Sequence, residues 1–262
     1  MDYRITGDVA LIVGGARGIG YAAAEALAAD GARVALADID RSAVTAAAER
    51  LAAASGVKVT GFGVDITSPT QVGELIAAVT SSLGAPSIVV QSAAVLDDKL
   101  FVDSGPADWK RMIDVCLYGP MNILHAVLPG MTERKYGRIV CLASDAARIG
   151  QARLSYYAAA KAGVIGLIKS VAQEVGGSGI TLNVVSPGAT NTELRQAREA
   201  GLLAQMGEEK YARRTRNVLR GYPTGRLGEP ADIGAAIAFL CSRQASWITG
   251  QVLSVNGGFV MP

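Results

Sequence analysis

Residues 8–29 constrain the fold more than any other part of the chain. Residues 8–14 (DVALIVG) form a short apolar run, a glycine-rich turn follows at once, and an alanine-rich segment begins at Tyr21. This order predicts a buried strand, a tight turn and a helix. Gly14, Gly18 and Gly20 leave the turn without side chains, so a phosphate group can approach the first N–H groups of the helix. A glycine cluster alone also fits an ordinary strand-to-helix turn, and the rest of the chain must decide between the two interpretations.

The same order of strand and helix continues along the chain. Strands that alternate with helical segments indicate a parallel sheet covered by helices on both faces, with ligands at the carboxyl ends of the strands. Asp65, Ser92, Ser144 and Pro187 all lie just beyond expected strands and should meet in one crevice. The further expected strands are 33–37, 57–62, 87–90, 138–142 and 181–185, and the expected helices are 21–29, 42–54, 69–83, 107–131 and 155–175.

A carboxylate ends the second expected strand. Asp38 lies about 20 residues beyond the glycine turn, where a Rossmann unit binds the adenosine ribose hydroxyls. The same charge repels a 2′-phosphate, by about 3 kcal/mol for two unit charges roughly 5 Å apart at an effective dielectric near 20. NAD(H) is therefore predicted to be favoured over NADP(H), although Arg17 and Arg41 are close enough in sequence to pair with a phosphate. The alternative is that Asp38 is an ordinary turn residue.

Tyr157 and Lys161 form the most reactive pair in the sequence. Both lie in an expected helix, where positions i and i+4 share a face, so the phenol and the ammonium point the same way. A free tyrosine has a pKa of about 10. A neighbouring cation favours the phenolate and lowers that pKa, which suits general acid–base work on an alcohol or a ketone. The motif is short and also arises by chance, so it needs support from the rest of the chain.

Charge and cysteine usage exclude several classes of function. A net charge of +2 is too small to indicate nucleic acid, and three scattered cysteines with one histidine do not form a familiar zinc site. No run of 18 apolar residues and no basic-then-apolar leader is present, so neither a membrane span nor secretion is expected. The protein is expected to be cytoplasmic, and any hydride chemistry must use an organic cofactor.

Several motifs, in the same order and spacing, resemble the short-chain dehydrogenase/reductase family. They are Gly14-x-x-x-Gly18-x-Gly20, Ser144, Tyr157-x-x-x-Lys161 and Pro187-Gly188-x-x-x-Thr192. The resemblance covers essentially the whole length, including a carboxyl end similar to the family's tetramer-forming tail. We therefore expect one Rossmann-type, doubly wound α/β domain over residues 1–262, with a mainly parallel seven-stranded sheet, a substrate lid at about 193–222, and assembly as a homotetramer or, failing that, a dimer.

The resemblance also implies roles for individual residues. Tyr157 would exchange a proton with the substrate oxygen, Lys161 would lower its pKa and hold the nicotinamide ribose, and Ser144 would hydrogen-bond the substrate oxygen. The activity implied is NAD(P)(H)-dependent interconversion of a secondary alcohol and a ketone. The implied cofactor site comprises Gly14, Arg17, Gly18, Ile19, Gly20, Asp38, Ile39, Asp65, Ile66, Ser92, Ala93, Tyr157, Lys161, Pro187, Gly188, Thr190 and Thr192, and no metal is implied.

Three departures from the family pattern are present. Residues 91–94 read Gln-Ser-Ala-Ala where the family has Asn-Asn-Ala-Gly, and Val13 replaces a threonine before the glycine turn. Since these segments contact each other in the family, we interpret both as one compensated change in the support under the cofactor. Cys116 replaces an asparagine of the family's proton relay, and a thiol is a weak donor and acceptor. The relay should therefore be impaired or rerouted.

The expected lid is rich in basic residues. Within residues 195–226, eight lysines and arginines stand against Glu199, Glu208 and Glu209, for a net charge of +5. One interpretation is an anionic substrate, such as a coenzyme A thioester or a phosphopantetheine arm, and the other is a solvated helix face. Residues 143–150 also resemble alicyclic hydroxyacyl-CoA dehydrogenases, which would place Arg148 near the cleft mouth. Gln173 stands where ketoacyl-carrier reductases commonly have arginine.

Two other classes of function stay open. One is a cofactor-binding protein with impaired catalysis, which the changes at Cys116 and residues 91–94 favour. The other is a non-redox enzyme on the same scaffold, an epimerase or a dehydratase. Intact Ser144, Tyr157 and Lys161 argue against the first, and nothing in the sequence supports the second specifically.

Overall fold

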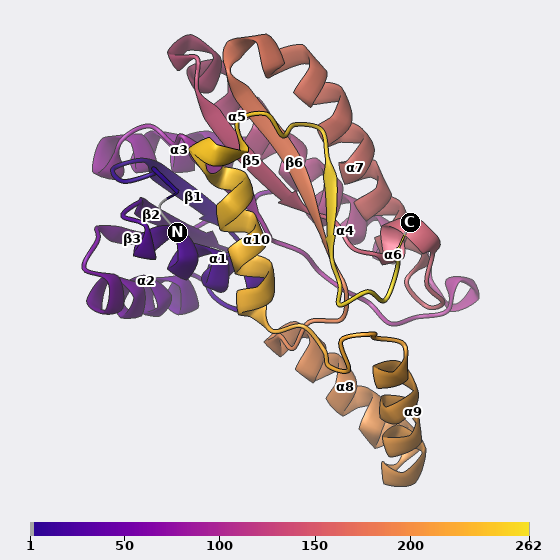
Figure 1. The fold of residues 1–262 in the computed structure, drawn as a ribbon. Coiled ribbons are helices and arrows are strands. Elements are labelled where there is room, and N and C mark those ends of the chain that lie inside the picture. The colour runs from indigo at the N-terminus through magenta and orange to yellow at the C-terminus, as the bar shows by residue number, and fades with distance from the viewer. Residues whose placement is uncertain (1–2, 262) are drawn as a thin grey trace.

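A parallel β-sheet forms the centre of the molecule (Figure 1). The computed structural model describes residues 3–261, and within them the sheet has seven strands in the order β3-β2-β1-β4-β5-β6-β7. This confirms the expected α/β fold of the Rossmann type. The strands are β1 (Val9–Val13), β2 (Arg33–Asp38), β3 (Val59–Gly63), β4 (Ile88–Gln91), β5 (Gly137–Leu142), β6 (Ile180–Pro187) and β7 (Val252–Val255).

The order of the strands reverses beside β1. The chain adds β2 and β3 on one side of β1, then returns to add β4 to β7 on the other side. In a doubly wound sheet, this reversal opens a crevice at the carboxyl ends of the central strands. The glycine turn follows β1 directly, so the topology places it at that crevice.

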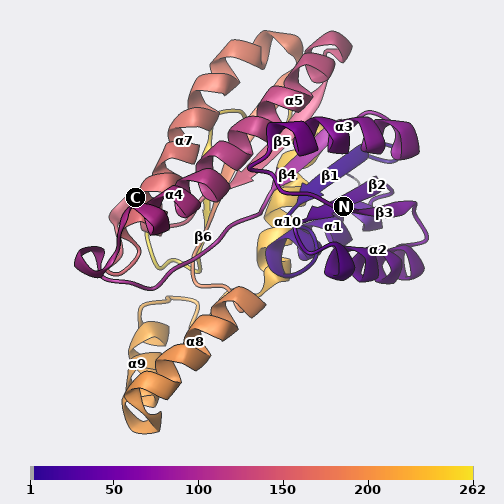
Figure 2. The ribbon, with the colours of Figure 1, turned by 180° about the vertical axis from the view of Figure 1, so that it is seen from behind.

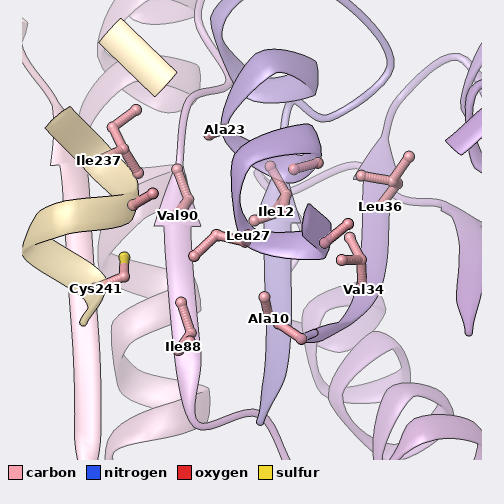
Figure 3. Close-up of a cluster of buried hydrophobic side chains, with 14 of the residues drawn as sticks. Ala10, Ile12, Ala23, Leu27, Val34, Leu36, Ile88, Val90, Ile237 and Cys241 are labelled. Carbon is pink, nitrogen blue, oxygen red and sulfur yellow. The ribbon is translucent and has the colours of Figure 1, made fainter. Parts of the chain in front are cut away.

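The central strands are apolar along their whole length because both faces of the sheet are covered. Every residue of β1 is buried. Ala10 and Ile12 pack with α1 and α10 on one face, as Figure 3 shows, whereas Leu11 and Val13 pack with α3, α5 and α7 on the other. The alternation along a single strand thus builds two separate cores.

The helices cover both faces of the sheet (Figures 1 and 2). Residues 230–255, which the sequence motifs treated only as the family's tail, form α10 and β7. The helices are α1 (Gly18–Ala29), α2 (Arg41–Ser55), α3 (Pro69–Leu83), α4 (Pro106–Ile113), α5 (Gly119–Arg134), α6 (Ala146–Ile149), α7 (Ser155–Val175), α8 (Glu193–Met206), α9 (Glu208–Arg220) and α10 (Pro230–Cys241).

The helix predicted over residues 107–131 is not uniform. A π-helical segment, Asp114–Tyr118, separates α4 from α5 and contains Cys116. Such segments bend a helix without ending it. The continuous run Pro106–Arg134 passes a length and composition test for a membrane-spanning helix, a test that core helices also pass. Here it packs against α3, α7 and β5.

Helices α8 and α9 extend away from the sheet as a pair (Figures 1 and 2). They cover most of the segment predicted as a substrate lid, which stays a prediction. Glu199 joins the two helices, since it accepts hydrogen bonds from Arg195 of α8 (3.2 Å) and from Arg214 (2.7 Å) and Tyr211 (3.1 Å) of α9.

Candidate active site

The glycine turn forms a tight cradle at the start of α1. Gly14 and Gly18 have positive φ angles of 76° and 56°, which favour glycine. A Cβ atom on Gly14 would lie 2.5 Å from the Ala93 nitrogen, and one on Gly20 would lie 2.1 Å from the Gly14 oxygen. No side chain caps the first N–H groups of α1, which leaves them directed at the cradle. These features fit a pyrophosphate, and Ile19 lies in this first turn as predicted.

The residues predicted to hold the adenosine half of a cofactor lie at the ends of β2 and β3. The Asp38 carboxylate accepts hydrogen bonds from the backbone nitrogens of Ala16 and Asp40, both at 3.3 Å. Ile39, which follows, is 75% exposed. Beyond β3, the Asp65 side chain accepts from the nitrogen (2.9 Å) and hydroxyl (2.8 Å) of Thr67 and so fixes the turn that carries Ile66.

The remaining predicted cofactor residues follow β4 and β6. Ser92 and Ala93 come directly after β4, and the Ser92 nitrogen donates to the Val13 oxygen (2.8 Å). Pro187 ends β6, and Gly188, Thr190 and Thr192 lead into α8. The Thr192 side chain lies against the glycine turn, 3.4 Å from where a Gly18 Cβ would be, and its hydroxyl caps α8 by accepting from Arg195. The structure thus brings these segments together at one edge of the sheet.

Ser144, Tyr157 and Lys161 also meet at this edge. Ser144 follows β5, and its side chain lies near enough to the phenol of Tyr157, in the first turn of α7, to lower the pKa of that phenol. The Lys161 Nζ donates to the Leu142 oxygen (2.8 Å) and lies 5.9 Å from the centre of the Tyr157 ring. Lys161 is only 2% exposed. The phenol, the hydroxyl and the ammonium therefore lie near one another, and their catalytic roles stay a prediction.

The electrostatics of Tyr157 differ from the expectation. Burial raises the pKa of the Tyr157 phenol above its usual range, and the Ser144 side chain lowers it in part. The lowered pKa expected from Lys161 was therefore wrong for this arrangement, because desolvation outweighs the other influences. A phenol that stays protonated at neutral pH is a proton donor.

Cys116 lies behind the tyrosine in an apolar cluster. It is fully buried with Met112, Tyr156 and Ala160, and Tyr157 packs against this cluster. Its sulfur contacts the Val95 oxygen and the Met112 sulfur, each at 3.7 Å. The altered proton relay stays a prediction.

Val13 and Gln91 are paired across β1 and β4, as the compensated change requires. Gln91 is 2% exposed, yet neither its amide nitrogen nor its amide oxygen has a hydrogen-bond partner among the described residues. An unpaired buried amide costs free energy of about 1–3 kcal/mol. The compensation is therefore incomplete, since Val13 offers the amide no partner.

Sequence reasoning missed one residue that joins the strand ends around the site. Asp145 is buried and accepts hydrogen bonds from Ser186 (3.0 Å) and Asn256 (2.6 Å), which joins the end of β5 to the ends of β6 and β7. Burial raises its pKa. Its place just after a strand was a usable signal. Arg148 donates to the Ser254 hydroxyl of β7 (2.7 Å), and its position near the cleft mouth stays a prediction.

The fold and the site together define a Rossmann-type oxidoreductase that uses a nicotinamide cofactor. A family model described as enoyl-(acyl carrier protein) reductase matches residues 14–260. The chain is 36% identical to the 3-oxoacyl-[acyl-carrier-protein] reductase FabG of Vibrio cholerae, covering 98% of this chain and 99% of the relative. The same reductase of Escherichia coli is 35% identical (97% and 98% covered), and the acetoacetyl-CoA reductase of Shinella zoogloeoides is 36% identical (95% and 97% covered). The chain belongs to the short-chain dehydrogenase/reductase family and is an NAD(P)-dependent oxidoreductase that interconverts a secondary alcohol and a ketone.

The comparisons overturn the predicted preference for NAD(H) over NADP(H). The FabG and acetoacetyl-CoA reductases among the relatives are NADPH-dependent. The prediction gave the repulsive charge of Asp38 more weight than Arg17 and Arg41, which it named as possible partners of a phosphate. In the structure, the Asp38 carboxylate already accepts two backbone N–H groups. Arg17 pairs with Asp40 (3.3 Å), and Arg41 lies over Gly63, the neighbour of Asp38 in the sheet.

Proposed function

We propose that this enzyme reduces the ketone of 3-oxoacyl thioesters. The relatives named above act on 3-oxoacyl-[acyl-carrier-protein] and acetoacetyl-CoA, and they match nearly the whole chain. The observation that carries the proposal is the convergence of Ser144, Tyr157 and Lys161 at the carboxyl ends of the strands, with the Tyr157 phenol protonated at neutral pH. Reduction of a ketone requires a proton donor of this kind beside the carbonyl oxygen.

Each residue of the site has a defined task in this proposal. A bound nicotinamide cofactor supplies the hydride that adds to the carbonyl carbon. Ser144 donates a hydrogen bond to the carbonyl oxygen and orients it toward Tyr157. Tyr157 transfers its proton to that oxygen as negative charge develops there, which yields the alcohol. Lys161 lies against the tyrosine ring, and its positive charge favours the phenolate left behind.

The cradle residues would hold the cofactor. The uncapped N–H groups of α1 and the bare turn at Gly14, Gly18 and Gly20 would bind the pyrophosphate. Asp38 would bind the adenosine ribose and Lys161 the nicotinamide ribose. The other residues of the predicted site, from Ile39, Asp65 and Ile66 to the segments after β4 and β6, would enclose the two ring systems.

Location and assembly are part of the same proposal. We propose a cytoplasmic homotetramer, or failing that a dimer, with no nucleic acid or membrane as partner. The exposed apolar side chains of Trp247 (99% exposed) and Leu253 (40%), at and just before the edge strand β7, support association of subunits.

Turnover with a defined substrate tests the proposal. Purified enzyme is given acetoacetyl-CoA with NADPH and, separately, with NADH, and loss of the reduced cofactor is followed by absorbance. Tyr157→Phe should lower turnover by a factor of about 10² to 10⁴, because a positioned acid is lost. Variant activity above about a tenth of wild type contradicts the assigned role of Tyr157. Absence of net cofactor oxidation by wild-type enzyme would favour an impaired binding protein or an epimerase, which returns its hydride.

A further inference from the structure

Asp98 joins two segments beside the candidate active site to α8. It lies in the connection after β4, Arg153 lies in the connection that leads into α7, and Arg198 lies on α8. One oxygen of the Asp98 carboxylate accepts from the Nε of Arg153, and the other accepts from the Nε of Arg198 (2.5 Å). The Arg153 side chain also donates to the main-chain oxygen of Asp98 (3.0 Å).

This cluster lies beside the start of α7. Arg153 lies in the turn that leads into α7 and has a positive φ angle of 70°. The neighbouring carboxylate of Asp97 accepts from the hydroxyl of Tyr156 (3.3 Å) and from Arg111 of α4 (2.5 Å). The connection that carries Asp98 is therefore held against α7 and α4. Helix α8 extends away from the sheet next to this connection (Figure 2).

The cluster holds more positive than negative charge. The Asp98 side chain is 15% exposed, that of Arg198 is 20% and that of Arg153 is 40%, so all three are partly shielded from water. Among the described residues, Asp98 is the only carboxylate within ion-pair distance of either arginine. The terminal nitrogens of Arg198 make no hydrogen bond to any described side chain or backbone atom. Two guanidinium groups thus converge on one carboxylate with donors to spare.

The other basic residues of the lid are paired within the lid or exposed to solvent. Arg195 and Arg214 share the Glu199 carboxylate where α8 meets α9, and Tyr211 also donates to that carboxylate. Arg226 pairs with Asp232 (2.6 Å). The remaining four, on the exposed surface of α9, are Lys210, Arg213, Arg216 and Arg220.

We propose that Arg153 and Arg198, held in place by Asp98, bind a phosphate group of the thioester substrate; this rests on the proposed reduction of 3-oxoacyl thioesters. A guanidinium group matches the geometry of phosphate oxygens. The two arginines already donate hydrogen bonds to one oxyanion, the carboxylate of Asp98. Coenzyme A and a phosphopantetheine arm share the required chemistry, because both carry a phosphate at the end of pantetheine.

Three acetoacetyl thioesters test the proposal: those of coenzyme A, of pantetheine 4′-phosphate and of neutral N-acetylcysteamine. The readout is the ratio of kcat/KM for each phosphate-bearing substrate to that for the neutral one. Arg198→Gln should lower this ratio about tenfold, since a charge-assisted hydrogen bond is lost. Asp98→Asn should raise it, because the cluster gains net positive charge. Arg216→Gln, on the exposed face of α9, should leave it unchanged.

Opposite shifts in the two variants separate binding from a purely structural role. If Asp98 only fastens α8, then both variants lower kcat/KM for all three substrates alike and the proposal is overturned. Shifts with coenzyme A but not with pantetheine 4′-phosphate would support the site and assign it to the nucleotide phosphates. Shifts with both would assign it to the 4′-phosphate. If the wild-type enzyme reduces none of the three thioesters, the proposed function is rejected instead.

Discussion

Tyr157 illustrates how the surroundings of one residue set its chemistry. Its motif with Lys161 suggested a cation that lowers the phenol pKa, yet the Lys161 ammonium donates to the Leu142 oxygen and burial controls the phenol. Desolvation always disfavours the charged form of an acid, and a neighbouring cation must overcome that cost before the pKa falls. The buried phenol is protonated at neutral pH, as free tyrosine is, and its raised pKa makes it a weaker acid than free tyrosine.

The influence of Ser144 on Tyr157 gives a prediction for the pH dependence. Ser144 lowers the pKa of Tyr157, so Ser144→Ala should raise that pKa further. Alcohol oxidation requires the phenolate, and its rate increases as the pH rises through the pKa. The rising limb of kcat/KM for alcohol oxidation should therefore move to higher pH in the variant, in addition to a lower rate. A limb at the same or a lower pH would mean that Ser144 does not tune the tyrosine.

At the scale of elements, a π-helical segment is present although the asparagine found there in the family is replaced. The long helix contains a π-helical segment at Cys116, although the family's asparagine is absent. This segment therefore forms among the packed side chains of Met112, Cys116 and Tyr156 and does not require an amide side chain. What the substitution removes is a polar group, which is why the proton relay is the property expected to change.

Helices α8 and α9 depend on one buried carboxylate. Hydrogen bonds from Arg214, Arg195 and Tyr211 hold the pKa of Glu199 below its usual range against the effect of burial. Glu199→Ala would leave two arginines without a partner where the helices meet, so we expect α9 to separate from α8. Hydrogen exchange should then accelerate in residues 193–220 and stay unchanged in the sheet. Glu208→Ala, on the exposed first turn of α9, is the matched control, and equal protection in both variants would contradict this role.

At the scale of the whole molecule, the reversal of strand order beside β1 assembles the site. Segments that follow β1, β2, β4, β5 and β6 meet at one edge, although they are spread over most of the chain. Strand β7 is an edge strand, because it has no neighbouring strand on one side within the described residues.

This edge gives a prediction for the assembly. Light scattering of the purified protein should give a mass four times that of one chain, or twice for a dimer. Trp247→Glu should yield a smaller species, since a charge replaces a fully exposed apolar side chain near β7. Val102→Glu, at an exposed apolar position on another element, should leave the mass unchanged. A monomeric wild-type protein would reject the assembly proposal.

The sequence alone determined the features that depend on local patterns. Apolar runs, helical spacing and the glycine turn identified the fold class and most of the elements, and they placed Ser144 at the end of a strand and Tyr157 with Lys161 on one face of a helix. These predictions succeed because secondary structure and the positions of strand ends depend on residues close together in the chain.

Only the tertiary structure decided which distant groups become neighbours and how far water is excluded. It left the Gln91 amide unpaired beside Val13, directed Arg148 to Ser254 and brought Asp98 between Arg153 and Arg198. Burial of Tyr157 reversed its expected pKa, and the prediction from Asp38 about the cofactor was wrong. The strength of a charge in a protein depends on desolvation and on partners remote in sequence, and neither can be read from the order of the residues.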